Sequence, residues 1–276
     1  MEDVKLIVDS GANARQNNQL TVVPLIITIA GKDFIDDEKL NMDDFIDAMA
    51  QNKEAGKTSC PSIDDWLRAL EGSKRAVMMT ITSGLSGSYS SAFQAKQIYE
   101  KEHPDSHIVV ADSRSAGPEM AVILGEIRRL LASQIRFVDL EEQISKYKSH
   151  THLLVMLQSL HNLALSGRIN LAVAKVARAL KINVVGTANL AGKLEPISKA
   201  RGIKRALKEI IRLMEEMNYQ GGRVVIDHCR NQKDAETLRD DIIAIYPQAE
   251  VDIRPERGLC SFYAEDGSLM VGFAER

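Results

Sequence analysis

The sequence predicts an α/β protein with two domains. The N-terminal one is expected to be a three-layer α/β/α domain with a mostly parallel sheet, and the C-terminal one an α/β domain with a mixed or antiparallel sheet. Short β-rich runs alternate with segments of helical periodicity along the 276 residues. Several runs, such as Ala76–Ile81, are continuously apolar, which is typical of strands buried on both faces. Closely spaced strands with turn residues such as Asp266-Gly267 favour antiparallel pairing near the C-terminal end.

Each element follows from its pattern of apolar residues. The expected strands are Val4–Val8, Leu20–Ile29, Ala76–Ile81, His107–Ala111, His152–Leu157, Ile182–Thr187, Arg223–Asp227, Glu250–Arg254 and Leu269–Phe273. The expected helices are Met42–Gln51, Ser62–Leu70, Gly87–Lys101, Glu119–Ala132, Leu140–Tyr147, Leu171–Leu180, Gly202–Met217 and Lys233–Ile245. Ser62 with Asp65 resembles a capping box, and Pro118 suits a first helical turn. We expect the domains to span residues 1–150 and 151–276.

Composition and charge exclude several classes of protein. The net charge is −3 and aromatic residues make up 5% of the chain, so neither a positive field nor base-stacking surfaces favour nucleic acid as a partner. The apolar stretch Leu20–Ala30 is short and contains Pro24, so it does not predict a membrane span. The first residues lack the layout of a signal peptide, and three cysteines far apart suggest no disulfide framework. The expected location is the cytoplasm.

The stretch ITSGLSGSYSSA, Ile81–Ala92, joins an expected strand to an expected helix. A phosphate loop would need a lysine after its last glycine, and Gly87 is followed by Ser88 instead. A nucleophile elbow would need GxSxG, which the sequence around Ser86 misses at the last position. A serine hydrolase with Ser86 as nucleophile remains an alternative.

The free N–H groups of a helix N-terminus, joined by hydroxyls from Ser83, Ser86 and Ser88, would attract an anion. A tight turn with serine caps explains the pattern equally well.

Three further segments carry polar groups that could meet such an anion. KTSCPS, Lys57–Ser62, is a second hydroxyl cluster just before a helix, and it also fits a simple N-cap. Gly167 is expected to end one helix, and Arg168 lies in the break before the next, where it would meet a phosphate or a partner's acid, or stay at the surface near a helix C-cap. Arg201 begins a basic helical face that is typical of a solvated surface or of a docking patch. Asp9 and Asp112 each follow a strand, where sites form in parallel sheets and where Asx turns are also common.

Taken in order, these segments resemble the DegV family of bacterial fatty-acid-binding proteins. The matching pieces are VKLIVDSGA, VPLIITIAGKDFID, KTSCPS, ITSGLSGSYSSA, VVADSRSAG, SLHNLALSGRINLA, GKLEPISKARGIKRAL and GSLMVGF, and they cover nearly the whole chain. The resemblance implies a two-domain α/β fold that holds one long-chain fatty acid between its domains. It implies that a separate ATP-dependent fatty acid kinase, not this chain, converts the bound acid to an acyl phosphate. No cofactor besides the bound acid is expected, and transient contact with a membrane is compatible with this role.

The resemblance also implies which residues act. Hydroxyl and backbone groups of Thr58, Ser59, Ser83, Ser86, Gly87 and Ser88 would hold the carboxylate, and Arg168 and Arg201 would serve the kinase or phosphoryl transfer. The family usually ends with a histidine-containing HxGPGALGxGF stretch, and Tyr263 stands where that histidine would be. A tyrosine hydroxyl can still donate a hydrogen bond to the acid. A further alternative is therefore that the protein binds another anionic lipid and has no kinase partner.

Overall fold

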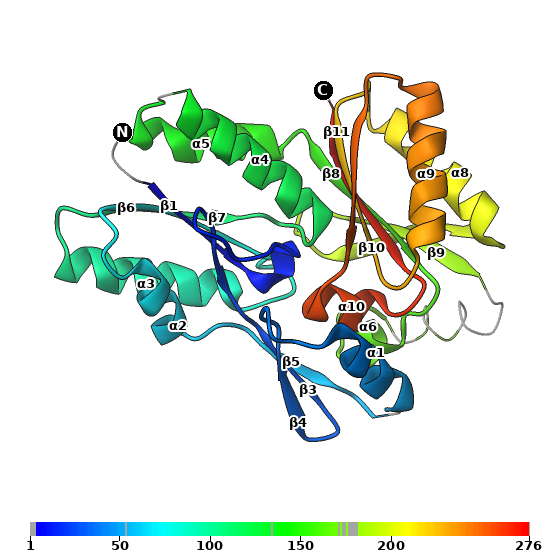
Figure 1. The fold of residues 1–276 in the computed structure, drawn as a ribbon, viewed down its shortest axis with the longest axis horizontal. Coiled ribbons are helices and arrows are strands. Elements are labelled where there is room, and N and C mark those ends of the chain that lie inside the picture. The colour runs from blue at the N-terminus through cyan, green and yellow to red at the C-terminus, as the bar shows by residue number, and fades with distance from the viewer. Residues whose placement is uncertain are drawn as a thin grey trace.

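A computed structural model describes residues 4–52, 54–133, 135–170, 172, 175 and 182–275. Over these residues it is an α/β structure built on three sheets (Figure 1). The strands up to residue 150 are β1 Val4–Asp9, β2 Thr21–Val23, β3 Ile26–Ile29, β4 Lys32–Ile35, β5 Lys57–Ser59, β6 Arg75–Thr80 and β7 His107–Asp112. The helices there are η1 Ser10–Ala12, α1 Met42–Gln51, α2 Ile63–Leu70, α3 Ser88–Glu102, α4 Pro118–Ala132, η2 Phe137–Asp139 and α5 Leu140–Lys148.

The first sheet has the order β2-β1-β6-β7, and all of its strands are parallel, as predicted. Successive strand residues point to opposite faces. Ile7 and Met78 pack against α2 and α3 on one face, whereas Val8 and Met79 belong to the core that includes α4 and α5. The predicted α/β/α layers are therefore present (Figure 1).

The second sheet has the order β10-β9-β8-β13-β11-β12. Its elements are β8 Thr151–Leu157, α6 His161–Leu165, β9 Asn183–Ala188, β10 Leu194–Ala200, α8 Ile203–Glu216, β11 Arg223–His228, α9 Gln232–Ile245, β12 Glu250–Pro255, α10 Gly258–Ala264 and β13 Leu269–Ala274. Only the β11–β12 pair is parallel among the described strands of this sheet, so the expected mixed sheet is confirmed. Helices α8 and α9 cover one face, and α6 and α10 lie against the other (Figure 1).

Helix α4 links the two halves of the molecule. It contributes to the core beside the first sheet, and it also packs closely on β13 and β11 of the second sheet. Gly272 of β13 permits this approach, because a Cβ there would lie 2.2 Å from the backbone nitrogen of Glu119. Every strand of the second sheet follows residue 150. The two domain ranges nevertheless remain a prediction, because α4 precedes residue 150 and contacts both sheets.

Several predicted elements need correction. The single strand expected over Leu20–Ile29 is two strands, β2 and β3, which are separated by Pro24 and Leu25 and belong to different sheets. Strands β4, β5 and β10 and helix α10 were not predicted at all. The Asp266-Gly267 turn joins α10 to β13 and does not connect two paired strands. The capping box of Ser62 and the helix start at Pro118 are confirmed. The helix expected over Leu171–Leu180 lies outside the described residues, except for Ala172 and Lys175.

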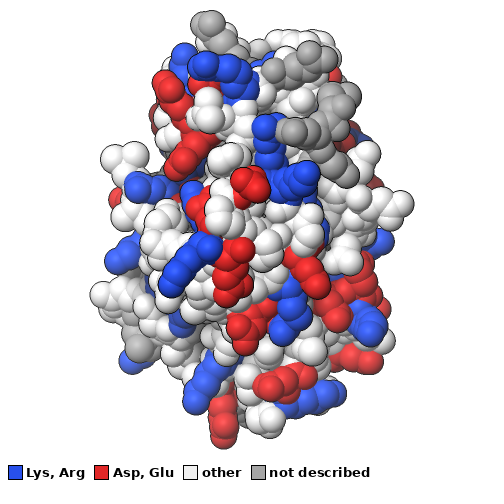
Figure 2. Space-filling view, turned by 90° about the vertical axis from the view of Figure 1, so that its left-hand side faces the viewer, with Lys and Arg blue, Asp and Glu red and all other residues white. Residues whose placement is uncertain are grey.

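No helix in the described part of the chain is long and apolar enough to cross a membrane. Figure 2 shows basic and acidic side chains interspersed over the face that it presents, with neither sign dominating. This mixture agrees with the net charge of −3.

Candidate functional site: a hydroxyl-ended apolar cavity

An apolar cavity of about 110 Å³ lies between the first half of the chain and the second sheet. Both halves of the chain and the two short helices α6 and α10 contribute its walls. The apolar lining residues are Leu25, Ile81, Leu85, Ala116, Leu153, Val155, Leu157, Leu163, Leu194, Leu259, Ala264 and Met270, and the polar or polarisable ones are Thr58, Ser86, Arg168, Cys260 and Tyr263. Arg168 is the single charged side chain among the described residues of this lining. The cavity lining therefore suits an apolar group that carries one polar end.

Thr58 and Tyr263, which are 205 residues apart in the sequence, meet at this cavity. Their hydroxyl oxygens share a hydrogen bond of 2.8 Å. The Arg168 guanidinium lies 5.8 Å from the centre of the Tyr263 ring, within the range of a cation–π contact. Arg168 also donates from Nη1 to the carbonyl oxygen of Ser166, 2.8 Å away. Three of the residues predicted from sequence therefore form one contact group at the cavity wall.

The serine-rich loop lies beside Thr58. A Cβ built on Gly87 would lie 3.1 Å from the Sγ of Cys60, which follows Thr58 by two positions. Ser86 lines the cavity, and its Oγ accepts a hydrogen bond of 3.3 Å from the backbone N–H of Ser88. The two hydroxyl clusters that the sequence suggested are thus neighbours in space.

Two other serines of this stretch, Ser83 and Ser88, bind carboxylates of the protein. Ser88 is buried and donates from Oγ to Asp9, 2.5 Å away, and Ser83 donates from Oγ to Asp112, 2.6 Å away. The backbone N–H groups of Ile81 and Ser83 bind the same two carboxylates. The acidic residues at the carboxyl ends of β1 and β7 therefore hold the loop in place.

Asp9 is fully buried, and burial raises its pKa to about 7, against the opposing effect of its hydrogen bonds from Ser88, Ile81 and Gly11. A buried carboxylate without a cation beside it needs such donors, since burying a charge without hydrogen bonds is costly. Asp9 accepts hydrogen bonds from three donors, which are the backbone N–H groups of Gly11 and Ile81 and the hydroxyl of Ser88. These hydrogen bonds offset the cost of burying the side chain.

The turn between β9 and β10 closes over this loop from the second half. Thr82 donates from Oγ1 to the carbonyl of Gly192 over 2.9 Å, and Arg114 donates from Nη1 to the carbonyl of Leu190 over 2.8 Å. Gly84 is needed at this contact, because a Cβ there would lie 2.2 Å from the Ala191 carbonyl oxygen. The loop that carries Ser86 is thus held from both halves of the chain.

The remaining predicted residues lie elsewhere. Ser59 is exposed at the end of β5, Gly87 is exposed at the start of α3, and Arg201 is exposed just before α8. None of these three is among the described residues that line the cavity. No group of three or more His, Cys, Asp or Glu side chains within the described ranges could hold a metal ion.

Sequence reasoning missed Cys260 and the whole of helix α10. Cys260 lies on the cavity wall, and complete burial raises the pKa of its thiol well above its usual value, so the thiol stays protonated. The apolar residues of GLCSFYA were the available signal, but seven residues are too few for a helical period to stand out.

Comparison with known proteins agrees with this geometry. The family described as "Uncharacterised protein, DegV family" matches residues 3–276. A DegV domain-containing protein of Streptococcus pneumoniae is 40% identical over 275 residues, which cover 98% of each chain. The structure of a DegV family protein from Eubacterium eligens loaded with heptadecanoic acid has a TM-score of 0.96 and 35% identity, and the match covers 99% of this chain and 100% of that one.

A second solved structure is equally similar. It is the Streptococcus pneumoniae fatty acid kinase (Fak) B3 protein loaded with linoleic acid, with a TM-score of 0.96, 39% identity and 99% of each chain covered. The family match spans nearly the whole sequence, and the curated relative and both structures match over the same length. This chain therefore belongs to the DegV family.

Proposed function

We propose that this protein binds a long-chain fatty acid, with the hydrocarbon tail in the apolar cavity and the carboxylate at the hydroxyls of Thr58, Ser86 and Tyr263. The observation that carries the proposal is the cavity itself, whose aliphatic walls meet a hydrogen-bonded hydroxyl pair beside a single arginine. The heptadecanoic and linoleic acids in the two similar structures support the same class of ligand.

Elementary energetics agree with this assignment. The tail of a long-chain acid has about 14 methylene groups, and each one that is buried contributes about 0.8 kcal/mol before the costs of ordering the ligand. The tail therefore supplies most of the affinity. The head-group site has to supply enough donors for a buried carboxylate, and hydroxyls that donate to a charged acceptor form the stronger kind of hydrogen bond.

We further propose that the protein is a carrier that presents the carboxylate to a separate ATP-dependent kinase, which forms the acyl phosphate. Arg168 is half-buried at the cavity, where its guanidinium could reach a transferred phosphoryl group. The fatty acid kinase (Fak) B3 protein among the similar structures supports a kinase partner. Arg201, exposed before the basic helix α8, is proposed to contact that partner.

The test is the ligand that accompanies the purified protein. Gentle purification from bacteria, organic extraction and lipid mass spectrometry should detect a long-chain fatty acid in near-stoichiometric amount. Delipidated protein should then bind added linoleic acid, and a reconstituted kinase should phosphorylate only the bound acid. If no fatty acid is extracted and none binds at micromolar concentrations, the binding proposal is wrong. Binding without any acyl phosphate would favour an anionic-lipid binder that lacks a kinase partner.

The serine hydrolase alternative loses its support at this site. No histidine, aspartate or glutamate is among the described residues that line the cavity, so none of these residues offers Ser86 a general base. A fluorophosphonate probe should leave Ser86 unlabelled, whereas labelling that Ser86→Ala abolishes would revive the alternative.

A further inference from the structure

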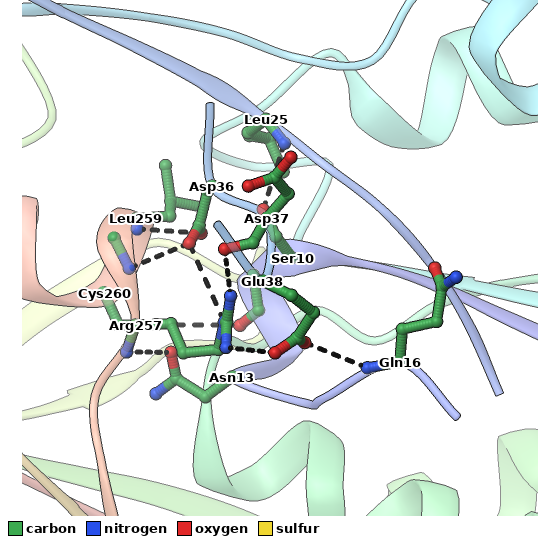
Figure 3. A network of polar contacts seen from close by, with 12 residues as sticks. Ser10, Asn13, Gln16, Leu25, Asp36, Asp37, Glu38, Arg257, Leu259 and Cys260 are labelled. Atoms are coloured by element: carbon green, nitrogen blue, oxygen red, sulfur yellow. Dashed lines mark hydrogen bonds and ion pairs between the residues drawn. The ribbon is translucent and has the colours of Figure 1, made fainter. Parts of the chain in front are cut away.

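Helix α10 forms the wall of the cavity that carries Tyr263, and its N-terminus lacks a local cap. The first N–H groups of a helix have no partner within the helix. The preceding residue, Arg257, provides no side-chain acceptor. Asp36, 222 residues away, accepts hydrogen bonds from the backbone N–H groups of Gly258 at 2.9 Å and Leu259 at 3.0 Å, one on each carboxyl oxygen (Figure 3).

Neighbouring contacts hold the same junction. The Arg257 backbone N–H donates to the side-chain oxygen of Asn13 over 3.0 Å, and its guanidinium binds the Glu38 carboxylate at 3.3 Å and the Asp37 carbonyl. Asp36 is fully buried, and Gly258 leaves room for it, because a Cβ there would lie 2.8 Å from the Asp36 carboxyl oxygen. Figure 3 shows these side chains converging on the segment that begins α10.

The position of Asp36 connects this cap to the head-group site. Asp36 directly follows β4, and Thr58 lies in β5; both strands pair with β3, where Ile27 faces Phe34 on one side and Thr58 on the other. One three-stranded sheet therefore attaches to α10 at two points. Asp36 holds the N-terminus of the helix, and Thr58 binds Tyr263 in its last turn.

We propose that Asp36 is a positioning residue for the fatty acid carboxylate, acting through α10 to hold the Tyr263 hydroxyl within reach of Thr58 and of the ligand. This inference rests on the proposed function. Without the cap, the helix can shift along the sheet, and Tyr263 no longer lies at a fixed distance from Thr58. The apolar tail contacts change less, since they involve many side chains from several elements.

The test is a double-mutant cycle on delipidated protein, with linoleic acid and linoleyl alcohol as probes. Asp36→Asn keeps the size of the side chain but replaces one acceptor oxygen by an NH₂ group that opposes a backbone N–H. We expect it to weaken binding of the acid at least tenfold and of the alcohol less than threefold. In the Tyr263→Phe background, Asp36→Asn should weaken acid binding less than threefold, because the two changes remove the same interaction.

Asp65→Asn is the matched control, because it removes the acidic member of the α2 capping box, which is not part of the cavity lining. It should leave acid binding unchanged.

Additive effects of Asp36→Asn and Tyr263→Phe, or equal losses for acid and alcohol, would overturn the positioning role. Should Asp36→Asn fail to fold, Asn13→Gly removes the neighbouring acceptor, together with the 2.7 Å hydrogen bond that Asn13 donates to Asp227, and suits the positive φ of 51° at that position. It should show the same non-additivity, and additivity would overturn the inference. Wild-type protein that binds no acid would instead contradict the proposed function.

Discussion

Replacing Tyr263 with phenylalanine tests the head-group site most directly, because it removes one hydroxyl and leaves the ring. The ring contacts Phe262 with centroids 4.9 Å apart and lies 5.8 Å from the Arg168 guanidinium. Neither contact involves the hydroxyl. The variant should therefore fold normally and lose only the 2.8 Å hydrogen bond to Thr58 and the donor that we assign to the carboxylate.

The expected loss follows from the strength of the bond. A hydrogen bond to a charged group contributes about 1.5–3 kcal/mol, and each 1.4 kcal/mol is about a factor of ten in Kd. The Kd for linoleic acid should therefore rise about 10- to 150-fold. We expect a value toward the lower end of this range, because the Thr58 hydroxyl loses its partner and is then free to donate to the carboxylate.

Titration of delipidated protein with linoleic acid measures this change, and linoleyl alcohol is the control ligand. The alcohol should bind wild type and variant with a difference of less than threefold, since it carries no charge. Tyr263→His should retain most of the affinity, because the imidazole can also donate a hydrogen bond. Equal losses for acid and alcohol, or an unchanged Kd for the acid, would refute the assignment of Tyr263 to the head group.

Three further predictions concern other parts of the molecule. Arg168→Ala should change the Kd of linoleic acid less than threefold but reduce kinase-dependent acyl phosphate formation at least tenfold. Ser86→Ala should instead weaken retention of the acid. Equal effects of the two variants on binding would contradict this division of roles. Burial raises the pKa of Glu256 from 4.5 to about 8, so its contribution to stability is lost as pH rises through that window. Urea unfolding should then find Glu256→Gln more stable than wild type by on the order of 5 kcal/mol near pH 9, with little difference near pH 4. Gly84→Ala should destabilise the protein by about 1–3 kcal/mol, because the added Cβ collides with the Ala191 carbonyl oxygen. The control is Gly125→Ala, whose Cβ would contact only the flexible end of the Arg223 side chain, and it should be close to neutral.

Local sequence predicted the elements whose signals are local. The continuous apolar runs of β1, β6 and β7 identified a parallel sheet, and Pro118 marked the start of α4. Strand β10 was missed although the exposure of its successive side chains alternates. Pro196 interrupts its sequence pattern, and the pairing register with β9 shifts between Pro196 and Ser198. Helix α10 was missed because it is too short for a helical period to stand out and because the side chain that caps it, Asp36, lies 222 residues earlier in the sequence.

The serine-rich loop shows where sequence reasoning about the site reached its limit. Its composition correctly indicated a strand, a tight turn and a helix, but it could not rank the serines. Ser83 and Ser88 differ from Ser86 only in their tertiary partners, Asp112 and Asp9, which come from other strands. Residue type thus identified a cluster of donors, and only the fold distinguishes the serine at the cavity from those that hold the loop.

The chemistry of the cavity end also bears on how a carrier releases its ligand. Apart from Arg168, the polar groups among the described lining residues are uncharged, so a carboxylate there is held by hydroxyl donors and is not trapped by several cations. A histidine at position 263, as in the usual family motif, would titrate in the physiological range and make the affinity depend on pH. A tyrosine hydroxyl donates a hydrogen bond without acquiring positive charge. Under the proposed function, most of the binding energy comes from the tail, so the hydroxyls only have to orient the carboxylate, and Arg168 is the residue proposed to meet an incoming phosphoryl group.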